Sequence, residues 1–225
     1  MSALMQPLFA GGQRDAEPID FLTLSAILLP GKEVDCTMYR IFVGLELPAL
    51  VTDQLARISC GLPGARWIEP EQMHITLRFI GEVDGGVFDD ALNALDTVSF
   101  DPFELQLKGV GSFPPRGRVD RLWAGVSNPE PLAALKTKID ASLARAGIER
   151  EQRKYVPHVA IARLKDCQSS KLGQYIVEYS LFESASFQVE QFHLYSSALS
   201  SSGAICRIEG SYQLRQRSSA REKSS

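Results

Sequence analysis

The chain contains three histidines, and two of them, His74 and His158, occupy matching settings. Their segments are Met73-His-Ile-Thr-Leu77 and Pro157-His-Val-Ala-Ile161. Because side chains alternate between the two faces of a strand, we expect His74 to share a face with Thr76, and His158 with Ala160. Imidazole titrates near neutral pH, so two histidines at one site can act as a general base and a general acid.

A lone strand histidine is more often a partly buried ring that bonds a backbone carbonyl, and this alternative applies to each motif. The occurrence of two matched copies favours a shared cleft with one imidazole on each side. His193, in Phe192-His-Leu-Tyr195, has no matched partner and is expected to be structural. A zinc site made of all three histidines is a further alternative, but no ligand spacing demands it, and we expect neither a metal nor a cofactor.

Strand-like and helix-like segments alternate on either side of these histidines. The first half predicts strands at 39–46 and around His74, a helix from Pro48 to Gly61, and a second helix over 87–98. Strands follow near 103–110 and 119–126. The pattern then repeats with a helix from Pro131 to Gly147, a strand over 155–164, a helix over 169–180, and strands near 187–195 and 205–214. We therefore predict an α+β fold, with two pseudo-symmetric lobes of antiparallel sheet, helices packed outside and an active-site cleft between the lobes.

Residues 38–215 are expected to form this single two-lobed domain. Residues 1–37 mix glycine, proline and charge without a sustained period and predict an irregular N-terminal extension, while residues 216–225 predict a disordered tail. The apolar run at 21–29 is far shorter than the roughly 20 residues of a membrane helix, and acidic residues precede it where a secretory signal would be basic. We expect a cytoplasmic protein with no membrane association.

The composition limits the possible partners. A net charge of −3 argues against a broad grip on long nucleic acid, although a local basic pocket for one phosphate is compatible with it. The four cysteines lie far apart without a CxxC pair, so free thiols are expected rather than a zinc knuckle or a disulfide framework.

From about Met38 to Leu214 the chain resembles the two-histidine (2H) phosphoesterases, and among them the RNA 2′,3′-cyclic phosphodiesterases, also called 2′-5′ RNA ligases. Three segments carry the resemblance: Tyr39-Arg-Ile-Phe-Val-Gly-Leu-Glu-Leu-Pro48, Arg66-Trp67 leading into His74-Ile-Thr-Leu-Arg-Phe-Ile-Gly-Glu-Val83, and Pro157-His-Val-Ala-Ile-Ala-Arg163. One HxT motif would be a weak signal. Two copies in matching surroundings are fairly specific.

The resemblance implies metal-independent opening of a terminal 2′,3′-cyclic phosphate to a 2′-phosphomonoester, with His74 as the general acid and His158 as the base. The sequence itself leaves the order of these roles open. Thr76 would hold a phosphate oxygen, and Arg163 would neutralise charge in the transition state. The family has Thr or Ser in both motifs, whereas this chain has Ala160 in the second, which lowers the expected rate by about tenfold to a hundredfold.

Phe113 and Arg78 are two further residues with expected positions near this site. Phe113 is the candidate platform for a stacked base, because single-stranded ends are commonly held on aromatic rings. Arg78 is expected on the same face as Thr76, either adding positive potential or lying solvated at a strand edge, and is left out of the catalytic set.

The expected partners are RNA ends or small nucleotides that carry a 2′,3′-cyclic phosphate, bound by a monomer. The main alternative is a non-catalytic RNA-end or nucleotide-binding module, in which Ala160 marks a degenerate second motif. Another cyclic or 2′-5′ linked substrate, or reverse ligation, is also compatible with the sequence.

Overall fold

The computed structural model describes residues 38–113, 121–200 and 203–215, and all of them belong to one compact unit, Asp35–Ser225. The helices are α1 (Ala49–Ile58), α2 (Gly85–Asp96), α3 (Glu130–Arg145), α4 (Ser169–Glu178) and the 3-10 helix η1 (Pro70–Gln72). The strands are β1 (Tyr39–Glu46), β2 (Ala65–Trp67), β3 (His74–Val83), β4 (Phe103–Leu105), β5 (Leu107–Ser112), β6 (Arg121–Val126), β7 (Val159–Leu164), β8 (Phe187–Val189), β9 (Gln191–Ser200) and β10 (Gly203–Gln213). The predicted extension, apolar run and tail lie outside the described residues.

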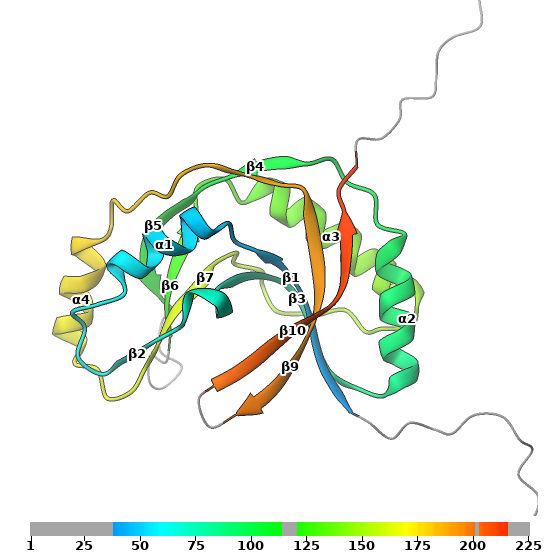
Figure 1. Cartoon of the computed structure of the whole chain (residues 1–225), viewed down its shortest axis with the longest axis horizontal. Coiled ribbons are helices and arrows are strands. Elements are labelled where there is room, and N and C mark those ends of the chain that lie inside the picture. The colour runs from blue at the N-terminus through cyan, green and yellow to red at the C-terminus, as the bar shows by residue number, and fades with distance from the viewer. Residues whose placement is uncertain (1–37, 114–120, 201–202, 216–225) are drawn as a thin grey trace, which may run out of the picture. The chain divides into compact units, whose positions relative to one another are not determined.

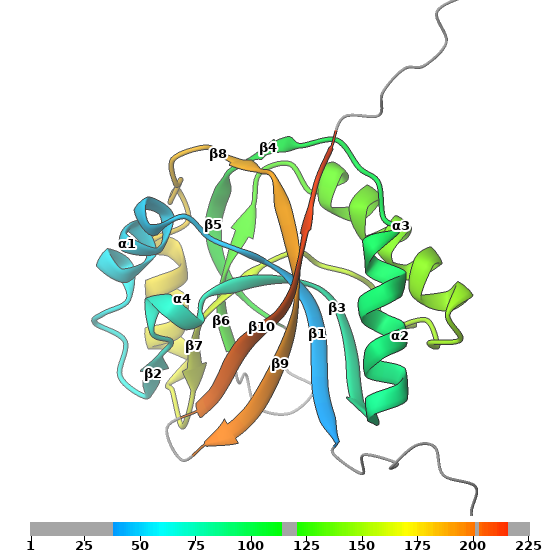
Figure 2. The same ribbon diagram turned by 45° about the vertical axis from the view of Figure 1, so that its right-hand side comes forward.

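Eight strands form an antiparallel sheet in the order β10-β9-β1-β3-β7-β6-β5, with β2 also paired to β7, and β4 and β8 form a separate two-stranded sheet. We call β1, β3, β9 and β10 the first lobe, and β2, β5, β6 and β7 the second lobe. Helices α2 and α3 lie with the first lobe, and α1 and α4 with the second (Figures 1 and 2). The predicted α+β fold with antiparallel lobes and outer helices is confirmed.

The two lobes exchange helices. Helix α1 follows β1 in the chain but lies with the second lobe, and α3 follows β6 but lies with the first. The repeated order strand, helix, strand, helix therefore runs as β1-α1-β3-α2 and β6-α3-β7-α4, with the first helix of each repeat crossing to the other lobe (Figure 2). The chain therefore passes between the lobes at each exchanged helix.

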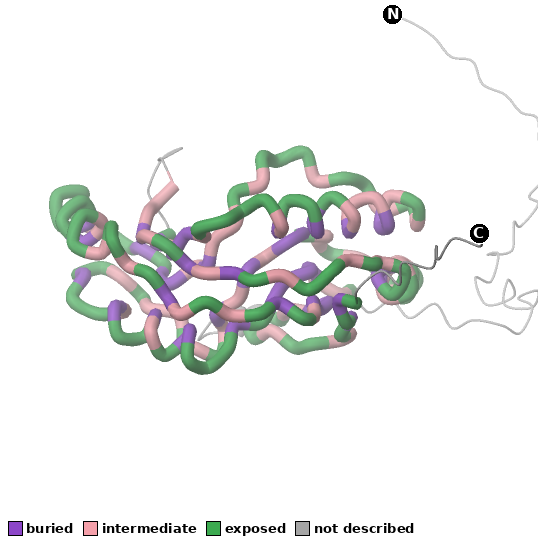
Figure 3. The backbone as a smooth tube through the Cα atoms, turned by 90° about the horizontal axis from the view of Figure 1, so that it is seen from above, coloured by how far each residue is buried: buried purple, intermediate pink, exposed green. Residues whose placement is uncertain are grey.

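The four α-helices and the longer strands each turn one side to a continuous core, as the alternation of buried and exposed residues along the tube shows (Figure 3). In α1 the buried positions are Val51, Thr52, Leu55 and Ile58, at helical spacing. Leu50, in the first turn of the same helix, lies outside this stripe and is exposed. Among the described residues, no helix combines the length and the apolar character that a bilayer crossing requires.

Candidate active site

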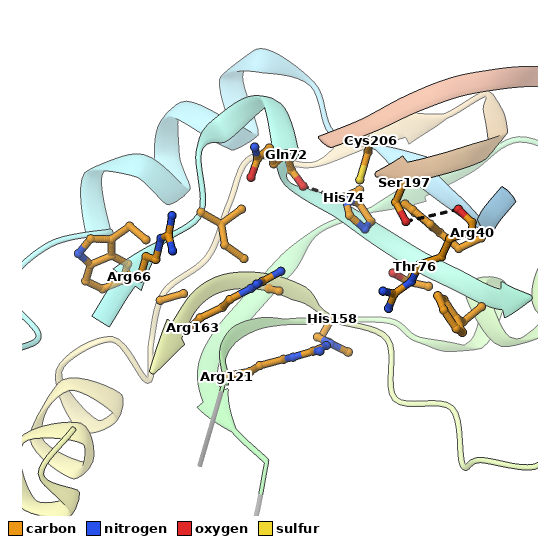
Figure 4. A pocket seen from close by; sticks show the side chains of 16 residues that line it. Arg40, Arg66, Gln72, His74, Thr76, Arg121, His158, Arg163, Ser197 and Cys206 are labelled. Carbon is orange, nitrogen blue, oxygen red and sulfur yellow. Dashed lines mark hydrogen bonds between the residues drawn. The ribbon is translucent and has the colours of Figure 1, made fainter. Parts of the chain in front are cut away.

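The lobes join where β3 meets β7, through the pairing of Ile75 with Val159. Both residues are fully buried, and each directly follows a motif histidine. Since neighbours of an inward-facing strand residue project to the opposite face, His74 and His158 both point away from the core. They line one cavity of about 230 Å³ to which both lobes contribute (Figure 4). The pairing between the lobes is thus what brings the two histidines together.

The two imidazoles are oriented by equivalent hydrogen bonds. Nδ1 of His74 lies 2.8 Å from the carbonyl oxygen of Gln72, and Nδ1 of His158 lies 2.7 Å from that of Val156. A carbonyl oxygen can only accept, so in each ring Nδ1 carries the proton and donates. Nε2 of each histidine therefore remains to exchange a proton with a molecule in the cavity.

Aromatic side chains pack against each imidazole. His74 stacks with Phe42 at 4.8 Å and with Tyr195 at 5.8 Å between ring centroids. His158 and Phe113 make an edge-to-face contact with 4.9 Å between ring centroids. Phe113 contacts that histidine instead of appearing among the residues that line the cavity, and the base-stacking role given to it from the sequence stays a prediction.

The surroundings lower the pKa of both histidines. For His74 the largest cause is burial, opposed by the bond to Gln72, and His158 lowers it further. For His158 burial is again the largest cause, opposed by the bond to Val156, and the positive charge of Arg121 lowers it further. Since burial and like charge both disfavour the imidazolium, these surroundings favour neutral rings.

A β-bulge follows each motif. In β3 the extra residue is Leu77, and in β7 it is Ile161, in each case the third residue after the histidine. A bulge shifts the side-chain alternation of the residues that follow it. Phe79 and Arg163, each five positions beyond a histidine, consequently line the same cavity as the histidines.

The bulge in β3 also corrects the expectation for Arg78, which neither shares the face of Thr76 nor lies solvated at an edge. Its side chain turns inward, and the residue is only 3% exposed. It donates to the carbonyl oxygen of Glu149, and its guanidinium lies 3.4 Å from the carboxylate of Asp140 and 3.7 Å from that of Glu151. Arg78 therefore fixes the segment between α3 and β7 that leads to His158.

Comparison with known proteins gives the family. The profile of the LigT-like phosphoesterases matches residues 45–123 and 125–206. The chain belongs to the LigT-like phosphoesterase family. An RNA 2′,3′-cyclic phosphodiesterase of Methanothermobacter thermautotrophicus is 33% identical over 74% of this chain and 94% of its own length, and one of Methanocaldococcus jannaschii is 31% identical over 75% and 97%. The fold resembles that of Escherichia coli LigT in its crystal structure, with a TM-score of 0.65 and 22% sequence identity. The match covers 80% of this chain and 99% of the LigT chain.

The phosphoesterase cavity contains three arginines that the sequence reasoning missed as site residues: Arg40, Arg66 and Arg121. Arg40 also lies over the ring of Phe79, 5.3 Å from its centroid. The sequence does hold a signal for two of them, because Arg40-Ile-Phe-Val-Gly44 and Arg121-Leu-Trp-Ala-Gly125 are alike. This repeat marks Arg40 and Arg121 as equivalent positions of the two halves.

The remaining expected site residues divide between the cavity and the core. Thr76 and Ala160 line the phosphoesterase cavity, one in each lobe. His193 does not line it: it is 2% exposed, and its Nδ1 lies 2.9 Å from Oγ of Ser211. The three histidines therefore do not converge, and the alternative of a zinc site built from all three is wrong.

Proposed function

We propose that this phosphoesterase hydrolyses terminal 2′,3′-cyclic phosphates of RNA to 2′-phosphomonoesters by acid and base catalysis between His74 and His158, without a metal. The observation that carries the proposal is the matched pair of imidazoles, each with Nδ1 bound to a carbonyl and Nε2 left for the cavity. The names of the curated relatives, RNA 2′,3′-cyclic phosphodiesterase, support the choice of substrate.

In the proposed reaction, neutral His158 removes a proton from water as the water oxygen attacks phosphorus. The bond from phosphorus to the ribose 3′ oxygen breaks, and His74, protonated at the start, gives its proton to that oxygen. The product is a 2′-phosphomonoester beside a free 3′ hydroxyl. Exchange with solvent returns the proton from His158 to His74, so the cycle consumes one water.

The negative charge of the substrate affects the protonation of His74 and His158. Burial lowers the pKa of both imidazoles, but an anion bound between them favours a protonated ring. The bound phosphate thus favours protonation of one imidazole, and that imidazole supplies the proton that the leaving oxygen needs. Thr76 is proposed to donate to a non-bridging phosphate oxygen, and Arg163 to stabilise the negative charge that develops there.

Base recognition has two aromatic candidates. Phe113 is the residue expected from the sequence, and it contacts His158. Phe79 lines the cavity, is 40% exposed and carries the Arg40 guanidinium over its ring, so we propose it as the better platform. We also propose that the protein is a monomer and that it is located in the cytoplasm, as expected from the sequence.

The test is product analysis on an oligonucleotide that ends in a 2′,3′-cyclic phosphate, incubated with the protein in EDTA. We expect a 2′-phosphate end and full activity in the chelator. A 3′-phosphate product would refute the assigned leaving group, and dependence on an added metal would refute the metal-free mechanism.

A second candidate function rests on Ala160, which removes a hydroxyl from one motif. A non-catalytic RNA-end binding module would bind the same oligonucleotide and leave it unchanged. Binding without turnover in this assay would therefore favour the binding module over the enzyme.

A further inference from the structure

The two histidines of the active site differ in the aromatic rings that pack against them. Phe42 lies opposite Tyr195 in the pairing of β1 with β9, and their rings stack with 9° between the planes and 4.9 Å between the centroids. Each of these rings also stacks on the imidazole of His74, with 28° between the planes and centroid distances of 4.8 Å and 5.8 Å. We call Phe42 and Tyr195 the ring pair.

The second lobe departs from this arrangement at both positions. By the repeat between β1 and β6, Phe42 is equivalent to Trp123. Trp123 is tilted by 58° relative to His158, with 6.2 Å between the centroids. The residue opposite Trp123 is Gly111, so the second lobe has a glycine where the first has Tyr195. The repeat therefore places two stacked rings beside one catalytic histidine and a single tilted ring beside the other.

Stacked aromatic faces favour a positive charge on the imidazole. The face of an aromatic ring is negative, and it attracts a cation that lies within about 6 Å of the ring centroid. Both members of the ring pair lie within this distance of His74. The plane of Phe113, the other ring that contacts His158, is turned by 83° from that imidazole. In the part of the chain that the structure describes, no ring stacks in parallel on His158.

The charged and titratable groups around His74 come from both lobes. The cavity that His74 lines is also lined by Arg40, Arg66, Arg121, His158, Arg163 and Cys206, and Glu46 lies opposite His74 in β1. The charge of His158 lowers the pKa of His74, and the charge of Arg121 lowers the pKa of His158. Burial raises the pKa of the Tyr195 hydroxyl and of the Cys206 thiol, so both are neutral near pH 7. Positive neighbours thus act on both imidazoles, whereas the ring pair acts on His74.

We propose that Phe42 and Tyr195 are positioning residues that make His74 the proton donor of the reaction, because their faces stack on its imidazole. This inference rests on the proposed function and gives a physical cause for the order of acid and base, which the sequence leaves open. The stack fixes the plane of the imidazole, and the bond from Nδ1 to Gln72 fixes its rotation within that plane. Nε2 is then held ready to give its proton to the leaving oxygen.

Titration of His74 by NMR, in the protein without substrate, tests the ring pair through Phe42→Leu and Tyr195→Leu. If the rings only buried the imidazole, the smaller leucine would expose it and raise its pKa. The loss of a stacked face should instead lower the pKa of His74 by about 0.5 unit in each variant. The matched control is Tyr195→Phe, which removes the hydroxyl but keeps the face and should leave the pKa of His74 as in the wild type.

The pH profile of kcat/KM on a dinucleotide with a 2′,3′-cyclic phosphate end should follow the titration. In the leucine variants the alkaline limb should move to lower pH, and the acidic limb should stay in place. A measurement on the wild type alone serves if a variant does not fold: His74 should titrate at a higher pH than His158. A pKa of His74 that stays or rises in the leucine variants, or that lies below the pKa of His158 in the wild type, would overturn the inference while hydrolysis stands. Failure of the wild type to hydrolyse the dinucleotide would instead overturn the proposed function.

Discussion

Trp123 lies directly opposite Ala160 in the pairing of β6 with β7, and opposite Gly111 in the pairing of β5 with β6. A Cβ atom on Gly111 would lie 2.5 Å from the indole ring, so the ring already fills the space above that glycine. In the first lobe the larger residue is at the motif position and the smaller one is opposite, because Thr76 lies opposite Gly44. The motif position that lacks its hydroxyl is therefore the one that faces the larger neighbour.

Restoring a small hydroxyl at this position should accelerate the reaction. Ala160→Ser adds one oxygen that can donate to the phosphate, and we expect kcat/KM on a cyclic-phosphate dinucleotide to rise by about tenfold. Ala160→Thr adds a methyl group beside Trp123 and is expected to lose about 1–3 kcal/mol of stability. Steady-state kinetics and urea unfolding of the two variants measure these effects. A serine variant slower than the wild type would show that no phosphate oxygen lies near residue 160.

The first lobe provides the converse experiment. Thr76→Ala places in β3 the residue that β7 has at the equivalent position, Ala160. The cavity then loses its remaining motif hydroxyl. We expect kcat/KM to fall by about tenfold to a hundredfold, since a charge-assisted hydrogen bond is lost. If kcat/KM falls less than twofold while the fold is intact, Thr76 does not hold the phosphate.

The pH dependence should report both imidazoles. The base must be neutral, so activity falls as the pH drops below its pKa, and the acid must be protonated, so activity falls as the pH rises above its pKa. Burial lowers both pKa values from the usual 6.5, so the bell-shaped profile of kcat/KM should have its maximum on the acidic side of pH 6.5. A maximum above pH 7 would contradict this assignment.

Arg121→Gln should show which histidine is the base. Arg121 lowers the pKa of His158, so the substitution raises that pKa. If His158 is the base, the acidic limb of the kcat/KM profile moves to higher pH and the alkaline limb stays in place. Movement of the alkaline limb alone would instead make His158 the acid and His74 the base.

The buried Arg78 makes a prediction about stability. Arg78→Met removes the cation that Asp140 and Glu151 share, which leaves Asp140 paired with Lys136 alone, and it removes the bond to the carbonyl of Glu149. The loss of these contacts of a buried arginine should lower the free energy of unfolding by about 1–3 kcal/mol. The control Arg145→Met removes an exposed arginine and should change it by less than about 0.5 kcal/mol. Equal losses in urea unfolding of the two variants would show that the Arg78 contacts contribute little.

Periodicity and turn residues predicted most of the fold, because each helix carries an apolar stripe and each strand an alternating or apolar run. The order of elements, the antiparallel lobes and the outer helices followed from these patterns. The exchange of α1 and α3 between lobes did not, since an apolar stripe shows that a helix packs but not on which lobe. His158 also lies just before β7 and not within a longer strand.

The site was less predictable than the fold, because bulges carry no clear mark in the sequence. Simple alternation grouped Arg78 with Thr76, whereas the extra residue at Leu77 sends Arg78 inward and turns Phe79 to the cavity. The pairing of Arg163 with Arg66 and with Arg121 depends on strand register between segments far apart in the chain, which a single sequence does not fix. The two histidines were identifiable because their motifs repeat.

The central claim is that His74 and His158 act on one phosphate. His74→Asn and His158→Asn test it directly, because the asparagine amide can replace Nδ1 as the donor to Gln72 or Val156 while no group replaces Nε2. The measurement is kcat/KM on a cyclic-phosphate oligonucleotide in EDTA for the wild type, both single variants and the double variant. We predict that each single variant loses about 10²–10⁴-fold and that the double variant is no slower than the worse single one. Losses that multiply in the double variant, or a single variant that retains wild-type activity, would contradict a shared reaction centre.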